Sequence, residues 1–325
     1  MSGLVVPLAY LETESANIDF GDGWELRPLD AKELTFIRSN FNVAQHFTLQ
    51  HHQEMLFALA QTCGPSEAPS SLDPRPATDI LRAMKLLHAG DMSTPLYFQL
   101  DNENRSLIGG LLPAKRLGSP YKLLSVEIDG LQKIIAAVRN VRAKDDQEIE
   151  NALSRFDDAC SRSRMEDQIV DCFTALESCL VPDGQTEIGF RLALRAAALL
   201  VGFRKPAHTR ELMKIGYDVR SKIVHGGAVL HRLFADNKFK KKLRPLKVIM
   251  GLDPDKPCIT DISFSVDVVT YTREALQVVL LSLGDKYESC DDLVSDLDRR
   301  VAAALEASGA SCSEPQILNI EHSAP

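Results

Sequence analysis

The sequence of 325 residues lacks the short motifs that mark the commonest nucleotide-dependent and hydrolytic enzymes. It contains no GxxxxGK[ST], no GxGxxG and no GxSxG pattern. ATPase, dinucleotide-binding and serine-hydrolase functions therefore have no support. No internal repeat is found either.

Closely spaced cysteines are also absent. The seven cysteines are odd in number and scattered, without a CxxC pair. This pattern argues against both a disulfide framework and a zinc knuckle, and it fits a reducing cytoplasm. We expect a cytoplasmic protein that needs no metal ion and no other cofactor.

No apolar run is long enough to cross a bilayer. The strongest run, LALRAAALLVGF, is short and carries Arg195. The first residues, MSGLVVPLAYLETE, have no basic leader and reach Glu12 too soon for a signal peptide. We therefore expect an intracellular protein without membrane contact.

Charge is unevenly distributed along the chain. The net charge is −8, yet the segment 204–244 contains twelve Lys or Arg and three Asp or Glu. This basic segment lies in an otherwise acidic protein. It is either a solvated surface with unevenly placed lysines or a site for a polyanion, because clustered Lys and Arg gain affinity for phosphates by counterion release.

The first 130 residues predict a mixed α/β, β-rich region. Short apolar or alternating runs predict strands at LVVPLAYL, NIDF, TPLYFQLDN and YKLLSVEI. Helical spacing predicts helices at DAKELTFIRSN, QHHQEMLFALAQT and ATDILRAMKLLHAG. The GDG before Trp24 predicts a hairpin turn, and the Pro- and Ser-rich segment 64–79 predicts an exposed loop.

Residues 131–310 predict an all-α bundle. Helical spacing recurs in DGLQKIIAAVRNV, QEIENALSRFDDACSRS, RMEDQIVDCFTALESCL, TEIGFRLALRAAALLVGF, HTRELMKIGYDVRSKIV, HRLFADNKFKKKL, 267–283 and 291–307. Short polar joints such as VPDGQ suit antiparallel neighbours. With 311–325 as a loose tail, the chain is predicted to be an α+β protein.

One segment, YDVRSKIVHGG, carries candidate chemistry. Arg220 and His225 form an R-x4-H pair, with Ser221 directly after the arginine. On a straight helix five residues advance about 7.5 Å and rotate about 140°, so the two side chains do not share a stripe. The glycines Gly226 and Gly227 could unwind the last turn and let His225 meet Arg220. Alternatively, the pair converges with its copy in a second chain across a two-fold axis.

An arginine and a histidine suit the metal-independent cleavage of RNA. Histidine, with a pKa near roughly 6.5, can take a proton from the ribose 2′-hydroxyl or give one to the leaving 5′-oxygen. Arginine stabilises the charge that develops on the phosphate. The expected product is a 2′,3′-cyclic phosphate. The other interpretation is structural: Arg220 pairs with a carboxylate of the bundle, and His225 caps the helix end.

Three segments together resemble the HEPN superfamily, specifically the Apea-like HEPN domain. They are FTALESCL, with an acidic position in ALE, FRLALRAAALLVG, with R-x-A-x-R-A-A-x-L, and YDVRSKIVHGG, with Y-x-x-RS-x-IVHG. The resemblance covers roughly Asp145 to Leu243, and more loosely the whole chain. It implies an up-and-down helical bundle that dimerises face to face.

The resemblance also implies a composite site, in which Arg220 and His225 of both protomers line a cleft. Many HEPN proteins are metal-independent ribonucleases in toxin–antitoxin and anti-phage systems, and others have lost activity and act as binding modules. Ser221 stands where the family often has Asn or Asp, and Glu177 falls where the family has a glutamate on an earlier helix. Glu177 is expected either to orient Arg220 or His225 or to form a plain salt bridge.

Further residues are candidates for RNA contact. The expected set lies in or beside the basic run and comprises Tyr217, Lys222, Lys238, Lys240, Lys241, Lys242 and Arg244. The run KFKKKL is either a solvated helix face or a phosphate track, and Tyr217 either stacks on a base or fills the bundle. Arg191 and Arg195 share a helix face and are expected to line the cleft or pair with acids of the dimer partner. The histidines His46, His51 and His52 favour a surface role over a metal site.

The sequence thus predicts a homodimeric HEPN-type endoribonuclease that acts in anti-phage defence or as a toxin. Its expected partners are RNA, a second copy of the chain, and an antitoxin or trigger protein. The rival prediction is a non-catalytic HEPN module that binds RNA, a nucleotide or a partner protein. A third alternative is a scaffold whose basic segment meets an acidic partner.

Overall fold

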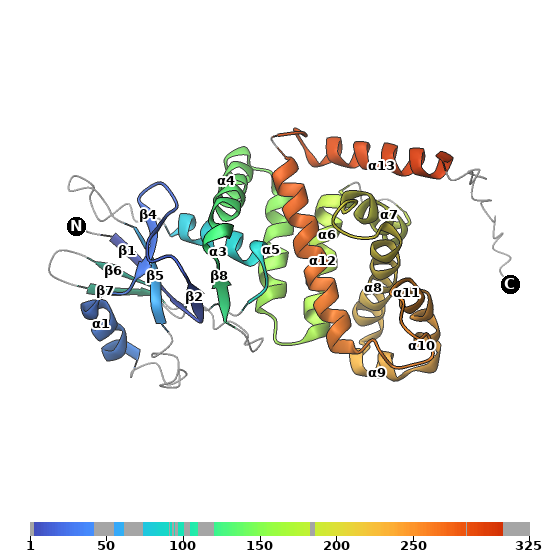
Figure 1. Cartoon of the computed structure of the whole chain (residues 1–325), viewed down its shortest axis with the longest axis horizontal. Helices are drawn as coiled ribbons and strands as arrows, with labels where there is room; N and C mark the ends of the chain where they lie inside the picture. The colour runs from blue at the N-terminus through green and yellow to red at the C-terminus, as the bar shows by residue number, and fades with distance from the viewer. Residues whose placement is uncertain are drawn as a thin grey trace, which may run out of the picture.

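The computed structural model describes residues 3–41, 55–61, 74–90, 92, 94, 97–100, 105–109, 120–182, 186–283 and 285–307. A small sheet lies at one end of the molecule, and helices fill the rest (Figure 1). The predicted α+β class is therefore confirmed. Within the described ranges, no helix combines the length and apolarity that crossing a membrane requires.

The main sheet is antiparallel throughout. Its six strands, in spatial order, are β3 (Ile18–Asp19), β4 (Trp24–Pro28), β5 (Met55–Gln61), β1 (Gly3–Ala9), β6 (Tyr97–Leu100) and β7 (Arg105–Gly109). A separate pair joins β2 (Leu11–Thr13) to β8 (Tyr121–Leu123) in parallel. The predicted GDG hairpin connects β3 to β4, and both of its glycines have positive φ, which costs glycine nothing.

Strand β1 is buried along its whole length because both faces of the sheet are covered. Leu4, Val6 and Leu8 belong to the core shared with the helices, whereas Val5 and Ala9 pack with Ile37 of α1 (Ala31–Phe41). Successive residues of a strand point to opposite faces, so one run serves two cores. The sheet is thereby fixed between α1 and the helical part of the chain.

Several predictions in the N-terminal region need correction. QHHQEMLFALAQT was predicted to be helical, but its described part is β5, which pairs with β1 and β4. A short apolar run does not distinguish a buried strand from a helix, and pairing on both sides decided the outcome. Helix α3 (Arg75–Leu87) begins inside the predicted loop 64–79. The predicted strand YKLLSVEI ends at Leu123, and a 3₁₀ turn follows it at Ser125–Glu127. Strand β7 was not predicted.

The helical part follows the predicted segments closely. Its long helices are α4 (Ile128–Lys144), α5 (Gln147–Ser161), α6 (Met165–Leu180), α7 (Ile188–Leu199), α8 (Pro206–Gly226), α12 (Asp261–Ser282) and α13 (Cys290–Ala307). A 3₁₀ turn, η2 (Ser125–Glu127), precedes α4. The expected boundary at residue 130 falls inside α4, and one buried cluster continues across it. The predicted tail, 311–325, lies outside the described residues.

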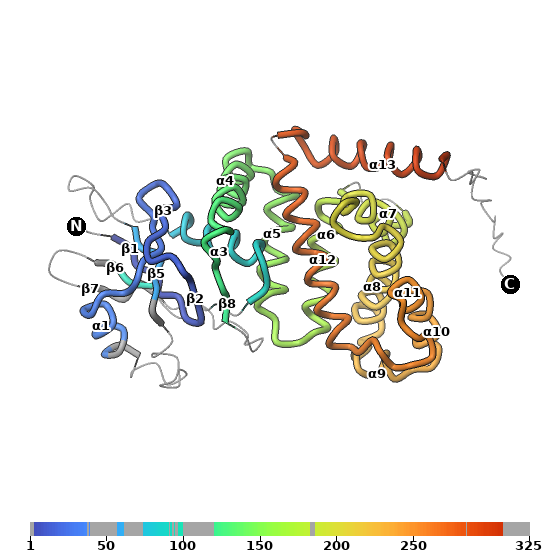
Figure 2. The backbone as a smooth tube through the Cα atoms, viewed as in Figure 1, coloured from blue at the N-terminus to red at the C-terminus, as the bar shows by residue number. Residues whose placement is uncertain are grey.

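The predicted single basic helix HRLFADNKFKKKL is divided in two. The chain forms α9 (Leu230–Ala235), α10 (Asn237–Lys242) and then α11 (Arg244–Ile249). Asp236 causes the break, because its carboxylate accepts bonds from the backbone N–H groups of Lys238 (2.5 Å) and Phe239 (3.2 Å) and caps α10. Figure 2 shows these short helices at the end of the molecule farthest from the sheet.

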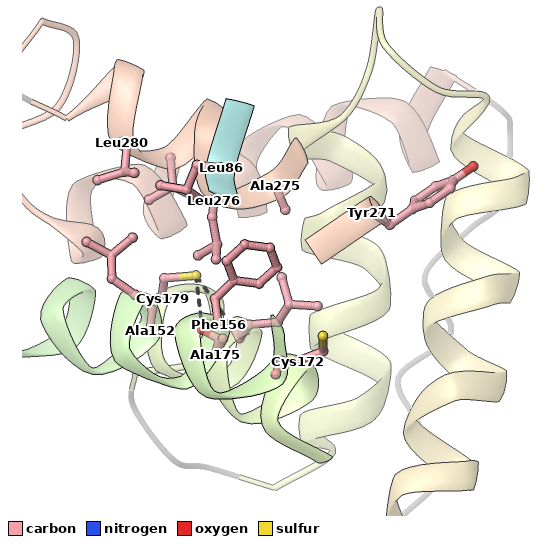
Figure 3. Close-up of a cluster of buried hydrophobic side chains, with 14 of the residues drawn as sticks. Leu86, Ala152, Phe156, Cys172, Ala175, Cys179, Tyr271, Ala275, Leu276 and Leu280 are labelled. Atoms are coloured by element: carbon pink, nitrogen blue, oxygen red, sulfur yellow. Dashed lines mark hydrogen bonds between the residues drawn. The ribbon is translucent and has the colours of Figure 1, made fainter. Parts of the chain in front are cut away.

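Helix α6 lies at the centre of the helical core. Figure 3 shows its Cys172 and Cys179 among Phe156 of α5, Leu276 of α12 and Leu86 of α3. Cys179 Sγ donates to the Ala175 carbonyl at 3.4 Å, and burial raises the pKa of Cys179 to about 12. These thiols behave as small apolar groups, and the cysteines of the described ranges are free.

Candidate functional site

Helix α8 carries the candidate motif without interruption. It begins at Lys205–Pro206, where proline suits the first helical position, and it runs through Gly226. Gly227 then adopts a left-handed conformation (φ 57°), and its N–H donates to Ile223 O at 3.0 Å. His225 therefore keeps helical geometry. The alternative in which the glycines turn His225 toward Arg220 of the same chain is wrong for this structure.

Arg220 is held at two points. Its Nη2 lies 3.3 Å from Oε2 of Glu177 on α6, and both side chains are 20% exposed. Its guanidinium carbon lies 5.7 Å from the centre of the Tyr217 ring. Nε of Arg220 is buried and has no hydrogen-bond partner among the described residues. The guanidinium is thus positioned, with part of its donor capacity unused.

Two glycines allow the helices around Tyr217 to approach closely. A Cβ at Gly189 of α7 would lie 2.4 Å from Tyr217 Cδ1, and a Cβ at Gly216 would lie 2.4 Å from Phe173 Cζ. The Phe173 and Tyr217 rings meet edge to face, with centroids 6.1 Å apart. Tyr217 is half-buried and packs in the bundle, where its ring supports Arg220. The geometry accounts for the packing role and leaves base stacking a prediction.

The carboxylate of Glu177 is destabilised by its surroundings. Burial raises the pKa of Glu177, while the charge of Arg220 and the Tyr217 hydroxyl act in the opposite direction. A buried carboxylate is retained as an anion only with such partners. Glu177, Tyr217 and Arg220 therefore form one unit, drawn from α6 and α8.

His225 stands apart from this unit. It is exposed on the last turn of α8, next to Val224, which is 48% exposed. Ser221 is half-buried and, four residues before His225, lies on the same side of the helix as that histidine. The structure brings Glu177 to Arg220 as predicted, but within one chain it does not bring His225 to them.

Two of the predicted RNA-binding lysines meet at one carboxylate. Asp218 Oδ2 lies 3.0 Å from Lys222 Nζ and 2.9 Å from Lys242 Nζ. Burial by itself would raise the pKa of Asp218, but the bonds to the two lysines lower it below its usual value. The Lys222 ammonium also lies 5.2 Å from the centre of the Phe239 ring. These contacts fasten α10 against α8.

The remaining basic residues point elsewhere. Lys240, Lys241 and Arg244 line a hollow beside α10 and α11, and Arg244 Nη2 lies 2.6 Å from Asp255 Oδ1. Lys238 is exposed on α10. The predicted phosphate track is therefore divided between the α8 side and a separate hollow.

Arg195 was expected in a cleft or at a dimer partner, and this prediction is wrong. The residue is 1% exposed. Its Nε and Nη2 donate to the Asp298 carboxylate of α13 at 2.8 and 2.7 Å, and Nη1 donates to Leu180 O at 2.6 Å. Arg195 therefore joins α7 to α13 and to the end of α6 within one chain.

The histidines His46, His51 and His52 lie outside the described residues. In the part of the chain that the structure describes, no group of three or more His, Cys, Asp or Glu side chains is arranged to hold a metal ion.

A polar cluster that the sequence did not reveal lies between α8 and α12. His208 Nδ1 and the Tyr271 hydroxyl share a short hydrogen bond, and Arg204 makes a two-point ion pair with Glu274. The Arg204 guanidinium carbon lies 4.9 Å from the centre of the Tyr271 ring. Burial lowers the pKa of His208. His208 and Tyr271 are 63 residues apart, so no local spacing could have paired them.

Comparison of the chain with protein-family models, with curated proteins and with solved structures gave no match.

Proposed function

We propose that the protein is a metal-independent endoribonuclease that acts as a HEPN-type homodimer, with Arg220 and His225 as its reactive pair. The observation that carries the proposal is the way in which the Arg220 side chain is held in place. Its guanidinium is fixed by Glu177 and Tyr217, yet its side chain is 20% exposed, so some of its donors can be reached by a ligand. A pre-positioned guanidinium with unused donors suits the recognition of a phosphate.

A second chain is needed to complete this site. Arg220 and His225 are five residues apart on an unbroken helix, which places them about 140° apart around its axis. Val224 lies on the same stripe as Tyr217 and Arg220 and is 48% exposed, and Phe190 of α7, next to Gly189, is 61% exposed. A copy packed on these apolar side chains, related by a two-fold axis, would supply the second Arg220–His225 pair.

The proposed reaction is transesterification. One His225 removes the proton from a ribose 2′-hydroxyl as its oxygen attacks the adjacent phosphorus. The bond from phosphorus to the 5′-oxygen breaks, and the second His225 gives that oxygen a proton. The products are a 2′,3′-cyclic phosphate and a 5′-hydroxyl end. Arg220 stabilises the charge of the phosphorane, Glu177 positions Arg220, and Ser221 lies beside them on α8.

The proposal also covers the residues that hold the RNA backbone and the biological setting in which the protein acts. Lys222 and Lys242, which meet at Asp218 beside α8, would hold the RNA backbone, because ammonium groups bind phosphates through charge. The resemblance favours a role in anti-phage defence or as a toxin in the cytoplasm, with an antitoxin or trigger protein as partner. The N-terminal region would restrain the nuclease or sense the trigger.

The test is cleavage of total RNA by the purified full chain in EDTA. Arg220→Ala and His225→Ala are compared with wild type and with Lys133→Gln, a control that removes an exposed charge on α4, outside the predicted RNA contacts. We expect wild type and the control to leave 2′,3′-cyclic phosphate ends, and the two site variants to lose roughly 100-fold or more in rate. Equal cleavage by all four proteins, or none by wild type across a range of triggers, overturns the proposal.

A non-catalytic RNA-binding module is the second candidate. It is favoured by the charge partner that Arg220 already has in Glu177, since a neutralised arginine is a weaker stabiliser of a phosphorane. In this case the protein binds RNA without cleaving it, and Arg220→Ala weakens binding. Affinity should fall steeply with salt if phosphates are contacted, and a flat response between low and high salt excludes such contacts.

A further inference from the structure

A second basic site lies away from Arg220 and His225. Helices α10 and α11 and the segment 254–259 border a hollow of about 550 Å³, a size typical of small-ligand sites. Lys240, Lys241, Arg244 and Lys247 line it, and Phe234 contributes a ring. These helices lie at the end of the molecule far from the sheet (Figure 1). We infer that this basic hollow binds a small organic phosphate, a phosphoryl group attached to a flat ring.

Charge is the first argument. Four cationic side chains line the basic hollow, against one carboxylate among its lining residues, Asp255. Asp255 accepts a bond from Arg244 Nη2 at 2.6 Å, so its charge is already compensated. The lysines therefore leave an excess of positive charge, most of which a phosphate of charge about −2 would neutralise.

Lys247 is the second and stronger argument. The residue is 5% exposed, and its Nζ donates to the carbonyls of Pro254 at 3.2 Å and Lys256 at 2.6 Å. A buried ammonium costs free energy unless an anion or a full set of acceptors surrounds it. Carbonyl dipoles supply two acceptors, and an ammonium has three donors. A phosphate oxygen in the hollow would satisfy the third donor and supply the missing negative charge.

The same lysine shapes the wall of the hollow. Both acceptors of Lys247 belong to the segment after α11, and Leu252 N–H donates to Lys247 O at 2.9 Å. The ammonium therefore holds this segment across from α10. The hollow is formed before any ligand arrives, which reduces the free energy that binding must spend on ordering the chain.

An apolar wall accompanies the charges and specifies the rest of the ligand. Phe234 is fixed by tilted contacts with Phe239 and Phe264, with ring centroids 5.1 and 5.4 Å apart. Pro257 and Ile259 extend the apolar surface. An aromatic ring and a proline accept a flat ring by stacking. Inorganic phosphate would use the charges alone, whereas a ring-bearing phosphate would use both.

The basic hollow is independent of the proposed nuclease site. Lys242 of α10 reaches Asp218 on α8, whereas Lys240 and Lys241 of the same helix line the hollow. The helix thus presents its lysines to two different places. Binding in the hollow should therefore persist in Arg220→Ala and His225→Ala, whatever these variants do to RNA.

The experiment is calorimetric titration of the full chain with AMP, ribose 5-phosphate and inorganic phosphate. We expect saturable binding, with AMP at least about tenfold tighter than inorganic phosphate. Lys247→Met and the double variant Lys240→Gln/Lys241→Gln should each weaken AMP binding about tenfold or more. Phe234→Leu should weaken AMP binding but leave inorganic phosphate unchanged.

Controls separate a built site from general attraction. Lys238→Gln, on the same helix, and Lys133→Gln, on α4, remove the same charge outside the hollow and should leave affinity unchanged. If Lys247→Met unfolds, the exposed pair Lys240 and Lys241 still provides the test. No saturable binding at about 1 mM ligand, or an equal loss in Lys238→Gln, overturns the inference.

Discussion

Arg220 Nη2 lies 3.3 Å from Glu177 Oε2, across 43 residues of sequence and between two neighbouring helices. Partly exposed ion pairs of this kind contribute only about 0–1 kcal/mol to the free energy of unfolding. The pair therefore does little for stability. Its main consequence is geometric, because it restricts where the guanidinium of Arg220 can point.

The first prediction concerns Glu177. Glu177→Gln keeps the size and one acceptor but removes the charge, so the free energy of unfolding should change by less than about 1 kcal/mol. If Glu177 positions Arg220 for the proposed reaction, kcat for RNA cleavage should fall roughly tenfold with KM nearly unchanged. Ser178→Ala, on the same helix, is the control for both quantities. A stability loss with unchanged kcat would instead identify a plain structural salt bridge.

The second prediction concerns two glycines of α8. A Cβ at Gly216 meets the Phe173 ring, whereas a Cβ at Gly226 meets nothing within 4 Å. Gly216→Ala should therefore lower the free energy of unfolding by about 1–3 kcal/mol through overpacking. Gly226→Ala should leave it unchanged or raise it by up to about 1 kcal/mol, because alanine is the better helix former. Urea unfolding of both variants measures the contrast, and equal effects would contradict it.

The third prediction concerns the link between α7 and α13. Asp298→Ala leaves the buried guanidinium of Arg195 without its carboxylate. Because Asp298 is itself 53% exposed, water partly replaces it, and we expect a cost of about 2 kcal/mol. Arg299→Gln, which removes an exposed charge on the same helix, should cost less than about 0.5 kcal/mol. A similar cost for both variants in urea unfolding would show that the link contributes little.

The fourth prediction is a pH dependence. Burial raises the pKa of Asp79 on α3 to about 6, against the charges of Arg142 and Arg82. The folded carboxyl then holds its proton more tightly than the unfolded one, whose pKa is about 3.9. The contribution of Asp79 to the free energy of unfolding is therefore complete below about pH 4 and is lost as pH rises through about 6.

This dependence is measured as a difference between two proteins. The free energy of unfolding of wild type minus that of Asp79→Asn should fall by about 1–3 kcal/mol between about pH 4 and pH 7. Arg142 Nη2 lies 2.5 Å from Asp79 Oδ1. If this ion pair outweighs burial, the difference rises with pH instead.

Helices in which apolar residues recur at helical spacing over several turns were predictable from the sequence. In α6, Ile169, Cys172, Phe173 and Leu176 form one stripe, and all four are fully buried. Such a stripe repeats over several turns, so few alternative structures fit it. By contrast, MLFALAQ is too short to show a period, and its conformation as β5 depends on hydrogen bonds to β1 and β4. The break between α9 and α10 occurs because Asp236 caps the first turn of α10. The helical spacing of the lysine-rich run did not indicate this break.

The sequence by itself determined that Arg220 lies near the end of a helix that glycine stops, because helix periodicity and a left-handed glycine stop are local properties, whereas the continuation of the helix through His225 was seen only in the structure. Only the tertiary structure decided that Glu177 and Tyr217 hold Arg220, and that Arg195 pairs with Asp298 instead of lining a cleft. These contacts join residues on different helices, and helix packing, which no local spacing encodes, sets their distances.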